Sequence, residues 1–458
     1  MGKTMIKDGT HGYSREDEWV KPESPELQER LEWFRDQKLG IMMHWGPHSL
    51  LGMFESWGLS DEDAHWSRGP VDWTDGEEFK KQYFALNKAF YPVRFQPDVW
   101  ADLAADNGFK YLIFTTKHHD GFCMWDTETT DYKSTSPEVP FSEHRYADIC
   151  KHLFNAFRER GLAISAYFSK ADWHTKTYWA PGMERSQPTW RGPSYNPAEH
   201  PRMWDEFVNF SHEQIMELMT KYGRIDVLWL DAGWVRADNG QDIRLGEVVA
   251  AAREHQPWLL TADRTVGGAH ENFITPEQAI PEQHMSVPWE SCITMGAGFS
   301  YRYEGEYKST RTLIHILMEV VAKGGNLALN IAPQPDGRLP EAAVKRMKEL
   351  GDWLKLYGEG VYGTRSCEPY FAQECAFTRK GSTVYCFRLY PEGAEVDEII
   401  RFPFNESIQS IELIDPEERL MFTMEDGRVS VVLPPGECAR SAPIAHVLRL
   451  TLRNEDNS

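Results

Sequence analysis

Short apolar runs alternate with stretches of amphipathic helical pattern from about Leu39 to Gly358. This alternation is typical of βα units, in which each buried strand is followed by a helix that covers a parallel sheet. Strands are expected at LGIMMHW (39–45), KYLIFTT (110–116), LAISAYF (162–168), IDVLWLD (225–231), WLLTAD (258–263) and GNLALNIAP (325–333). Helices are expected between them at 97–107, 145–160, 203–222, 243–255 and 310–323. The pattern over 279–300 does not indicate where a strand or helix begins and ends.

The pattern changes after a helix predicted at 341–356. Runs such as STVYCFRLY, RVSVVLP and HVLRLTLR alternate apolar and polar residues, which indicates antiparallel strands. Glycines in YGEGVYGTR, from Tyr357 to Arg365, mark the change. A chain of 458 residues also exceeds the roughly 250–300 that one core organises. We therefore predict a (β/α)8 TIM-like barrel over residues 1–360 and a C-terminal antiparallel β-sandwich over residues 361–458.

Charge and composition narrow the classes of function. A formal net charge of −21 argues against nucleic acid as a partner, because phosphate binding relies on a basic surface. No run of about 18 apolar residues is present, so no membrane partner is expected. Seven cysteines without a CxxC pair predict free, buried thiols. The seventeen tryptophans exceed what folding alone requires, and their flat faces suit sugar rings.

The first residues, MGKTMIKDGTHGYSREDEW, contain no apolar core of a signal peptide. As given, the sequence is expected to be cytoplasmic, or secreted or periplasmic if a signal segment was removed from it.

Polar and aromatic side chains follow the predicted strands at one end of the sheet. In a parallel barrel the catalytic groups project from the carboxyl ends of the strands. The residues found there are His44 and Trp45, Lys117 to Asp120, Tyr167, Trp229 with Asp231, and Arg264. A pocket is therefore expected at this end of the barrel.

Three histidines are candidates for this pocket. His44 interrupts the apolar run IMMHWG, and a buried imidazole needs hydrogen-bond partners, whether it belongs to a site or to the core. His118 and His119 are adjacent, so both reach one cavity only if the backbone turns, as Gly121 would permit. The three could bind a metal, but no HExxH or similar ligand pair supports that interpretation, and no metal or other cofactor is expected.

Asp231 ends the run IDVLWLD between Trp229 and Trp234. A carboxylate directly after a buried strand must be paired or functional, although it could instead cap a following helix. Two residues compete to be a second catalytic carboxylate. Glu290 in VPWESC lies beside a tryptophan, which could raise its pKa, whereas Glu277 in ITPEQAIPE could also belong to the first turn of a helix. The residues alone do not decide between them.

Six blocks, in this order, resemble the α-L-fucosidases of glycoside hydrolase family 29. They are WFRDQKLGIMMHWG, RFQPDVWADLAADNGFKYLIFTTKHHDGF, YFSKADW, YGRIDVLWLDAGW, VPWESC and KSTRTLIHILMEVVAKGGNLALNIAPQPDG. The KHHDGF block and the aspartate of LWLDAGW are the most specific of these.

The resemblance implies roles for individual residues. Asp231 would be the nucleophile, and the residues around the fucose would be His44, His118, His119, Tyr167, Trp229 and Arg264. Family members differ in their acid/base residue, and the glutamate of a WE block is a common one, so Glu290 is preferred to Glu277, which is retained as a substrate contact. Many members carry Glu-Trp-Tyr after the first strand. The nearest segment here is DEDAHWSRG, in which Trp66 matches the tryptophan but His65 stands in place of the glutamate.

The resemblance predicts an exo-acting, retaining α-L-fucosidase without a cofactor. Its expected partner is a fucosylated oligosaccharide or glycoconjugate, and a homo-oligomer is left open. Two alternatives remain: a lectin-like pseudoenzyme that binds fucose, and a metal-dependent hydrolase that uses the histidines as ligands. A transfucosidase would share every residue.

Overall fold

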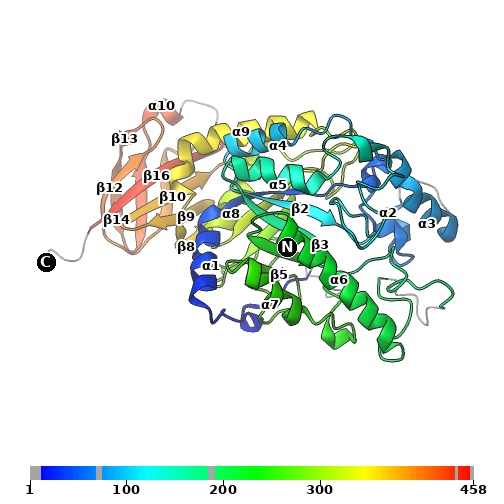
Figure 1. Ribbon diagram of the computed structural model, residues 1–458. Coiled ribbons are helices and arrows are strands. Elements are labelled where there is room, and N and C mark those ends of the chain that lie inside the picture. The colour runs from blue at the N-terminus through cyan, green and yellow to red at the C-terminus, as the bar shows by residue number, and fades with distance from the viewer. Residues whose placement is uncertain (1–11, 69–74, 184–190, 439–441, 454–458) are drawn as a thin grey trace.

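The computed structural model describes residues 12–68, 75–183, 191–438 and 442–453 (Figure 1). A curved parallel sheet with helices around it occupies most of the chain, and antiparallel sheets follow at the carboxyl-terminal end. This is the fold class that the sequence predicts.

The parallel sheet has seven strands in the order β5-β4-β3-β2-β1-β7-β6. They are β1 (Leu39–Met43), β2 (Tyr111–Lys117), β3 (Ala163–Ser169), β4 (Val227–Asp231), β5 (Leu260–Asp263), β6 (Glu290–Thr294) and β7 (Asn326–Asn330). The six predicted strands are confirmed, with ends shifted by a few residues. The seventh, β6, lies in the segment for which the pattern sets no register.

The eighth position of the barrel, between β5 and β6, is irregular. Residues 264–289 run there without a strand and make only isolated bridges, from Gly268 to Trp19, from Glu271 to Ala262, from Ile274 to Trp289 and from Glu277 to Cys292. This segment contains three prolines, which lack the N–H that a central strand must donate. Glu277 also does not begin a helix, which corrects the alternative interpretation of its sequence context.

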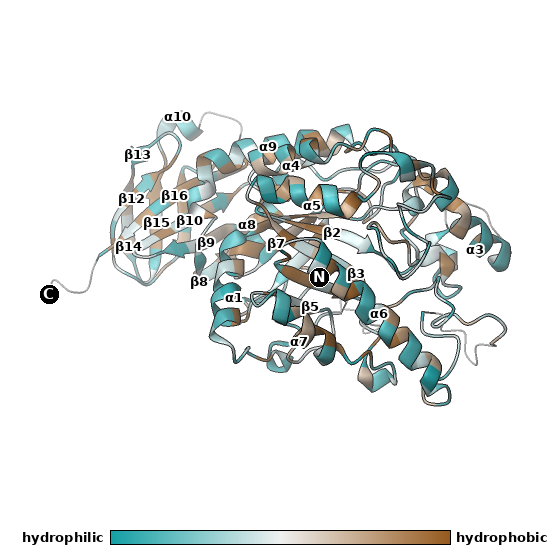
Figure 2. Ribbon diagram, viewed as in Figure 1, coloured by the Kyte–Doolittle hydropathy of each residue, from teal (hydrophilic) through white to brown (hydrophobic). Residues whose placement is uncertain are grey.

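Helices cover the outer face of the sheet, with apolar residues turned towards it (Figure 2). They are α1 (Pro25–Gln37), α4 (Pro97–Asp106), α5 (Ile149–Glu159), α6 (Pro201–Lys221), α7 (Leu245–His255), α8 (Thr310–Ala322) and α9 (Glu341–Tyr357). Two short helices, α2 (Ala64–Ser67) and α3 (Gly76–Phe84), belong to the loop after β1. Short 3-10 helices occur at Glu16–Glu18, Pro47–Leu51, Trp57–Leu59, Ala85–Ala89, Pro140–Glu143, Ala237–Asn239 and Gly358–Gly360.

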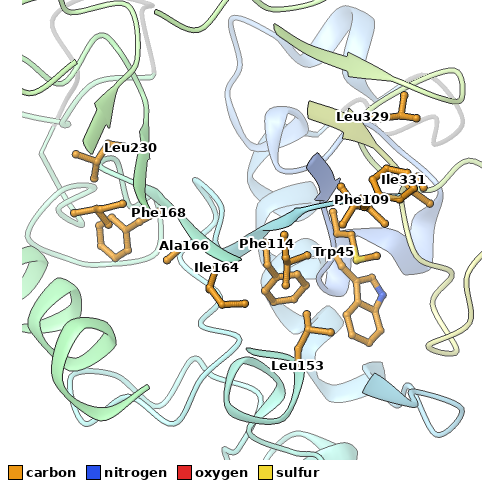
Figure 3. Packing of buried hydrophobic residues seen from close by; sticks show 14 of the residues in the cluster. Trp45, Phe109, Phe114, Leu153, Ile164, Ala166, Phe168, Leu230, Leu329 and Ile331 are labelled. Carbon is orange, nitrogen blue, oxygen red and sulfur yellow. The ribbon is translucent and has the colours of Figure 1, made fainter. Parts of the chain in front are cut away.

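The main core lies between the sheet and these helices (Figure 3). Phe114 and Ile164 project from neighbouring strands towards Leu153 of α5, and Trp45 packs nearby. Continuous burial along β2 explains why the sequence shows an unbroken apolar run there, because helices cover the outer face of the sheet and side chains fill the barrel inside it.

The carboxyl-terminal part forms the predicted β-sandwich. One sheet contains β8 (Arg365–Ala372), β9 (Cys375–Lys380), β10 (Thr383–Leu389), β12 (Ile408–Leu413), β13 (Glu418–Arg419) and β16 (Ala445–Leu452). The other contains β11 (Ile399–Pro403), β14 (Met421–Glu425) and β15 (Arg428–Val432), and a short helix, α10 (Pro435–Cys438), follows. Side chains of both sheets share one core, in which the rings of Phe377 and Phe402 lie 5.4 Å apart. The architecture changes between α9 and β8, and the division at residue 360 into separate domains stays a prediction.

The sandwich lies at the end of the barrel opposite to α2 and α3 (Figure 1). Arg365 at its start pairs with Asp36 of α1 at 2.5 Å and with Glu32 at 2.8 Å. Arg311 of α8 donates to the carbonyl of Tyr390 at 2.6 Å. The sandwich therefore braces the barrel at a distance from the carboxyl ends of β1 and β2.

The six cysteines whose side chains the structure describes are free and buried, as predicted for them. Within the described ranges, no helix combines the length and the apolar character needed to cross a bilayer.

We expect Gly40→Ala to destabilise the barrel by about 1–3 kcal/mol, because overpacking a core forces side chains off their rotamers. A Cβ at Gly40 in β1 would lie 2.3 Å from the ring of Tyr111. The shift in the midpoint of urea unfolding measures the effect. Gly436→Ala is the control, since among the described residues beyond its chain neighbours and its own helix backbone no atom lies within 4 Å of a Cβ at that position. Equal midpoints for the two variants would contradict this prediction.

Candidate active site

A cavity of about 230 Å³ opens at the carboxyl ends of the parallel strands. Its wall includes Met42, His44, Glu55, Trp57, Asp63, Trp66, His118, Tyr167, Arg191, Trp229, Asp231, Gly233, Trp234, Arg264, Glu277, Cys292 and Phe299. Pockets for drug-sized ligands usually measure roughly 300–1,000 Å³, so this cavity suits a smaller molecule, such as one sugar residue.

Asp231 is a buried carboxylate in the wall of the cavity, and both of its oxygens accept hydrogen bonds. It ends β4, and Ala232 turns the chain away with a φ of 68°. Tyr167 donates a hydrogen bond to its Oδ2 at 2.5 Å, and Arg264 donates to Oδ1 at 2.9 Å. Burial would raise the pKa of Asp231, but Arg264, His119 and the Tyr167 hydroxyl together hold it well below its usual range. Asp231 is therefore ionised at neutral pH, as a nucleophile must be.

Arg264 joins two carboxylates. One terminal nitrogen pairs with Asp231, and the other pairs with Glu277. The Arg264 side chain is only 8% exposed. The guanidinium thus fixes the two acids side by side on the wall of the cavity.

Each of the three predicted histidines makes a side-chain hydrogen bond through its Nδ1. The partner of His44 is Asn330 Oδ1 at 2.9 Å, that of His118 is Ser56 Oγ at 2.6 Å, and that of His119 is Ser169 Oγ at 2.7 Å. These side-chain partners fix the orientation of all three rings.

Burial keeps the three imidazoles neutral. It lowers the pKa of His44 and of His119 to about 4, and it lowers the pKa of His118 well below its usual value. Neutral imidazoles can donate or accept hydrogen bonds with sugar hydroxyls.

The expected turn after β2 is present. The N–H of Gly121 donates to the carbonyl of His118 at 3.1 Å, and Gly121 has a φ of 79°. The rings of His118 and His119 consequently lie 4.1 Å apart. His118 lines the cavity, while His119 Nε2 lies 3.8 Å from Asp231 Oδ2.

His118, His119 and Asp231 place three ligand atoms within 4.8 Å of one another. Zinc accepts such ligand types. Arg264 already compensates the charge of Asp231 at 2.9 Å, however, and a metal ion there would face the guanidinium. The electrostatics of the site favour a neutral ligand over a metal ion.

Aromatic side chains surround the carboxylates. The indole of Trp229 stacks on the ring of Tyr167 with centroids 5.2 Å apart and planes inclined by 17°. Trp66 lies at the rim, 41% exposed, and its Nε1 donates to Asp63 at 3.1 Å. Both tryptophans therefore line the cavity at which the sequence placed them.

Several residues of the cavity were not predicted. Glu55 is 3% exposed, and burial raises its pKa to about 7. It interrupts the apolar run LLGMFESWG much as His44 interrupts its strand, and that signal could have identified it. Arg191 makes two hydrogen bonds to Asp63, at 3.0 and 2.7 Å, a contact between distant loops that leaves no local signal. His65 is exposed and does not line the cavity.

Glu290 does not line the cavity. It begins β6, so it lies at the amino end of that strand, and it is 1% exposed. Tyr111 donates to it at 2.5 Å and Trp229 Nε1 donates at 3.1 Å. Burial raises its pKa to about 7. The structure thus brings Glu277, and not Glu290, to the wall beside Asp231.

Comparison with known proteins shows the family to which this chain belongs. The family profile of α-L-fucosidases matches residues 10–359. The plasma α-L-fucosidase of Rattus norvegicus is 29% identical over 353 residues, which cover 73% of this chain and 71% of that protein. The solved structures of Paenibacillus thiaminolyticus α-L-fucosidase isoenzyme 1 and Thermotoga maritima α-fucosidase are each 28% identical to this chain, with TM-scores of 0.75 and 0.74. Each comparison covers 94% of this chain and 100% of the other. The chain therefore belongs to the α-L-fucosidase family of glycoside hydrolases.

Proposed function

We propose that this α-L-fucosidase removes a terminal fucose from a glycan by double displacement, with net retention of configuration. The observation that carries the proposal is the pair of carboxylates, Asp231 and Glu277, on the two terminal nitrogens of Arg264. A retaining glycosidase needs two carboxyl groups roughly 5–5.5 Å apart. One shared guanidinium is a means of keeping such a spacing.

In the first step, Asp231 attacks the anomeric carbon of fucose. The bond from that carbon to the aglycone oxygen breaks, and a proton from Glu277 passes to the leaving oxygen. A fucosyl ester on Asp231 results. The Thermotoga maritima relative has been solved with a mechanism-based inhibitor, which supports a common mechanism.

In the second step, water replaces the aglycone. Glu277 takes a proton from this water, the oxygen attacks the anomeric carbon, and the ester bond to Asp231 breaks. Two inversions at the same carbon give retention. Both acids return to their starting protonation states, so no cofactor is required.

The rest of the cavity is proposed to hold the sugar. His44 and His118 would bind ring hydroxyls with His119 behind them, and Trp229 would pack against an apolar part of the ring. Trp66 at the rim would contact the remainder of the fucosylated oligosaccharide or glycoconjugate. Glu55 would supply the carboxyl that is missing at His65, which stands in place of the glutamate before Trp66. A lectin-like pseudoenzyme would not need two carboxylates on one guanidinium.

Asp231→Ala should lower kcat for an aryl α-L-fucoside by on the order of 10⁴ or more, because the covalent step has no substitute. Azide, which can enter the space vacated by the carboxylate, should restore turnover and yield β-fucosyl azide. Chromatography and NMR of the product test this, with circular dichroism to check folding. Retention of more than about a tenth of the wild-type kcat would refute the role of Asp231.

Glu277→Ala should impair a substrate with a poor leaving group far more than an activated one, because protonation matters only when the leaving oxygen is basic. The measurement compares kcat/KM for a fucosylated disaccharide and for α-L-fucosyl fluoride, whose leaving group requires little protonation. Glu55→Ala and Glu290→Ala are the matched variants, and each should slow both substrates by similar factors. Whichever of the three glutamates shows the leaving-group dependence is the acid, so a dependence confined to Glu55 or Glu290 excludes Glu277.

Prolonged dialysis against EDTA should leave kcat unchanged, since Arg264 and not a metal ion compensates the charge of Asp231. Metal content and activity are measured on the same sample. Loss of activity on dialysis, with recovery on addition of zinc, would instead support His118, His119 and Asp231 as metal ligands.

A further inference from the structure

Glu290 is a buried carboxyl that the proposed reaction does not use. We infer that Glu290 is a positioning residue, which acts through the indole of Trp229 on the two groups that hold the nucleophile. The inference rests on the proposed function of Asp231.

Glu290 is fixed at the amino ends of the parallel strands, which we call the floor of the barrel. Its backbone N–H donates to the carbonyl of Ile274 at 2.8 Å, and it pairs in register with Asn326 of β7. One carboxyl oxygen accepts from Tyr111 at 2.5 Å, and the other accepts from Trp229 at 3.1 Å. Both oxygens are therefore engaged, and neither reaches the cavity.

The floor also fixes the direction of the carboxyl. Tyr111 begins β2, and its ring crosses β1 at Gly40, where any Cβ would lie 2.3 Å from it. Its hydroxyl consequently meets Glu290 from one side, which leaves the second oxygen for the indole. One carboxyl oxygen of Glu290 is thus held in a defined position to accept the hydrogen bond of the Trp229 indole.

Trp229 touches both groups that bind Asp231. Its ring stacks on Tyr167 at 5.2 Å, and the guanidinium of Arg264 lies 5.9 Å from its centroid. Tyr167 and Arg264 in turn donate to the two oxygens of Asp231. A tilt of the indole would therefore move both donors of the nucleophile.

Trp229 is itself only 2% exposed, and its N–H points to Glu290, which lies outside the wall of the cavity. Without Glu290 this donor would be buried and unsatisfied, and the ring would turn to find another acceptor. The carboxyl at the floor is thereby coupled to the geometry at the mouth of the barrel, although it contacts no substrate.

A double-mutant cycle tests the coupling. Glu290→Leu removes the acceptor at similar volume, and Trp229→Phe removes the donor but keeps a ring against Tyr167. We expect Glu290→Leu to lower kcat roughly 10- to 100-fold, since small misplacements of reacting groups cost up to about that factor. The loss should be equal for α-L-fucosyl fluoride and a fucosylated disaccharide. The double variant should be no slower than Trp229→Phe alone.

Two further variants separate positioning from stability. Glu290→Gln keeps an acceptor oxygen and should retain kcat within about threefold. Tyr111→Phe removes the other hydrogen bond of Glu290 but leaves the acceptor of Trp229 in place, so it should lower kcat less than Glu290→Leu does at a comparable loss of melting temperature. A merely structural role would predict equal losses of kcat for Tyr111→Phe and Glu290→Leu at equal losses of stability.

Three results would overturn the inference. They are full kcat in Glu290→Leu, additive losses in the double variant, and a loss confined to the disaccharide, which would make Glu290 the general acid. If the wild-type protein cleaves neither substrate, the proposed function fails together with the inference. Normal wild-type turnover with additive losses overturns the inference alone.

Discussion

The negative charge of Asp231, buried at the end of β4, determines which side chains must lie around the cavity at the carboxyl ends of the strands. An uncompensated carboxylate in a medium of low dielectric would lose tens of kcal/mol of hydration energy, so a cation and hydrogen-bond donors must stand beside it. Arg264 and Tyr167 meet this need. Arg264 is buried as well, and it pairs with a second carboxylate, Glu277. In the proposed first step Glu277 is protonated, so Asp231 supplies the negative charge that faces a transition state with the positive charge of an oxocarbenium ion.

The histidines beside Asp231 are uncharged, and this matters for the electrostatics of the same cavity. Burial holds His44 and His119 uncharged down to a pH of about 4. Protonated imidazoles would place positive charge against a developing cation and would compete with it for Asp231. Uncharged rings can instead bind hydroxyl groups without weakening the field of the carboxylates. Desolvation, rather than a charged partner, thus keeps these imidazoles neutral and able to contact a sugar.

Most of the parallel sheet could be predicted because its strands are buried on both faces, so that β1 and β2 appear as unbroken apolar runs. The strand ends likewise placed His44, Tyr167 and Asp231 near one another. β6 was not predicted, because the prolines before it obscure the pattern.

The rest of the site depends on contacts between residues far apart in the sequence, which no local sequence pattern predicts. Asp63 and Arg191 meet across 128 positions of the chain. VPWESC shows a glutamate beside a tryptophan, but it does not show that the glutamate begins the strand and faces the floor. The role of acid given to Glu290 stays a prediction, and the geometry favours Glu277.

The irregular segment between β5 and β6 has a consequence for how such enzymes diverge. Glu277 is carried by a stretch that makes isolated bridges and no continuous ladder. An insertion or deletion in a ladder shifts every later side chain to the opposite face, whereas this stretch can change length and leave its neighbours in register. Asp231, at the end of a strand paired on both sides, has no such freedom. The proposed nucleophile is therefore held in register by the barrel itself, while the segment that carries the proposed proton donor can change in length without disturbing it.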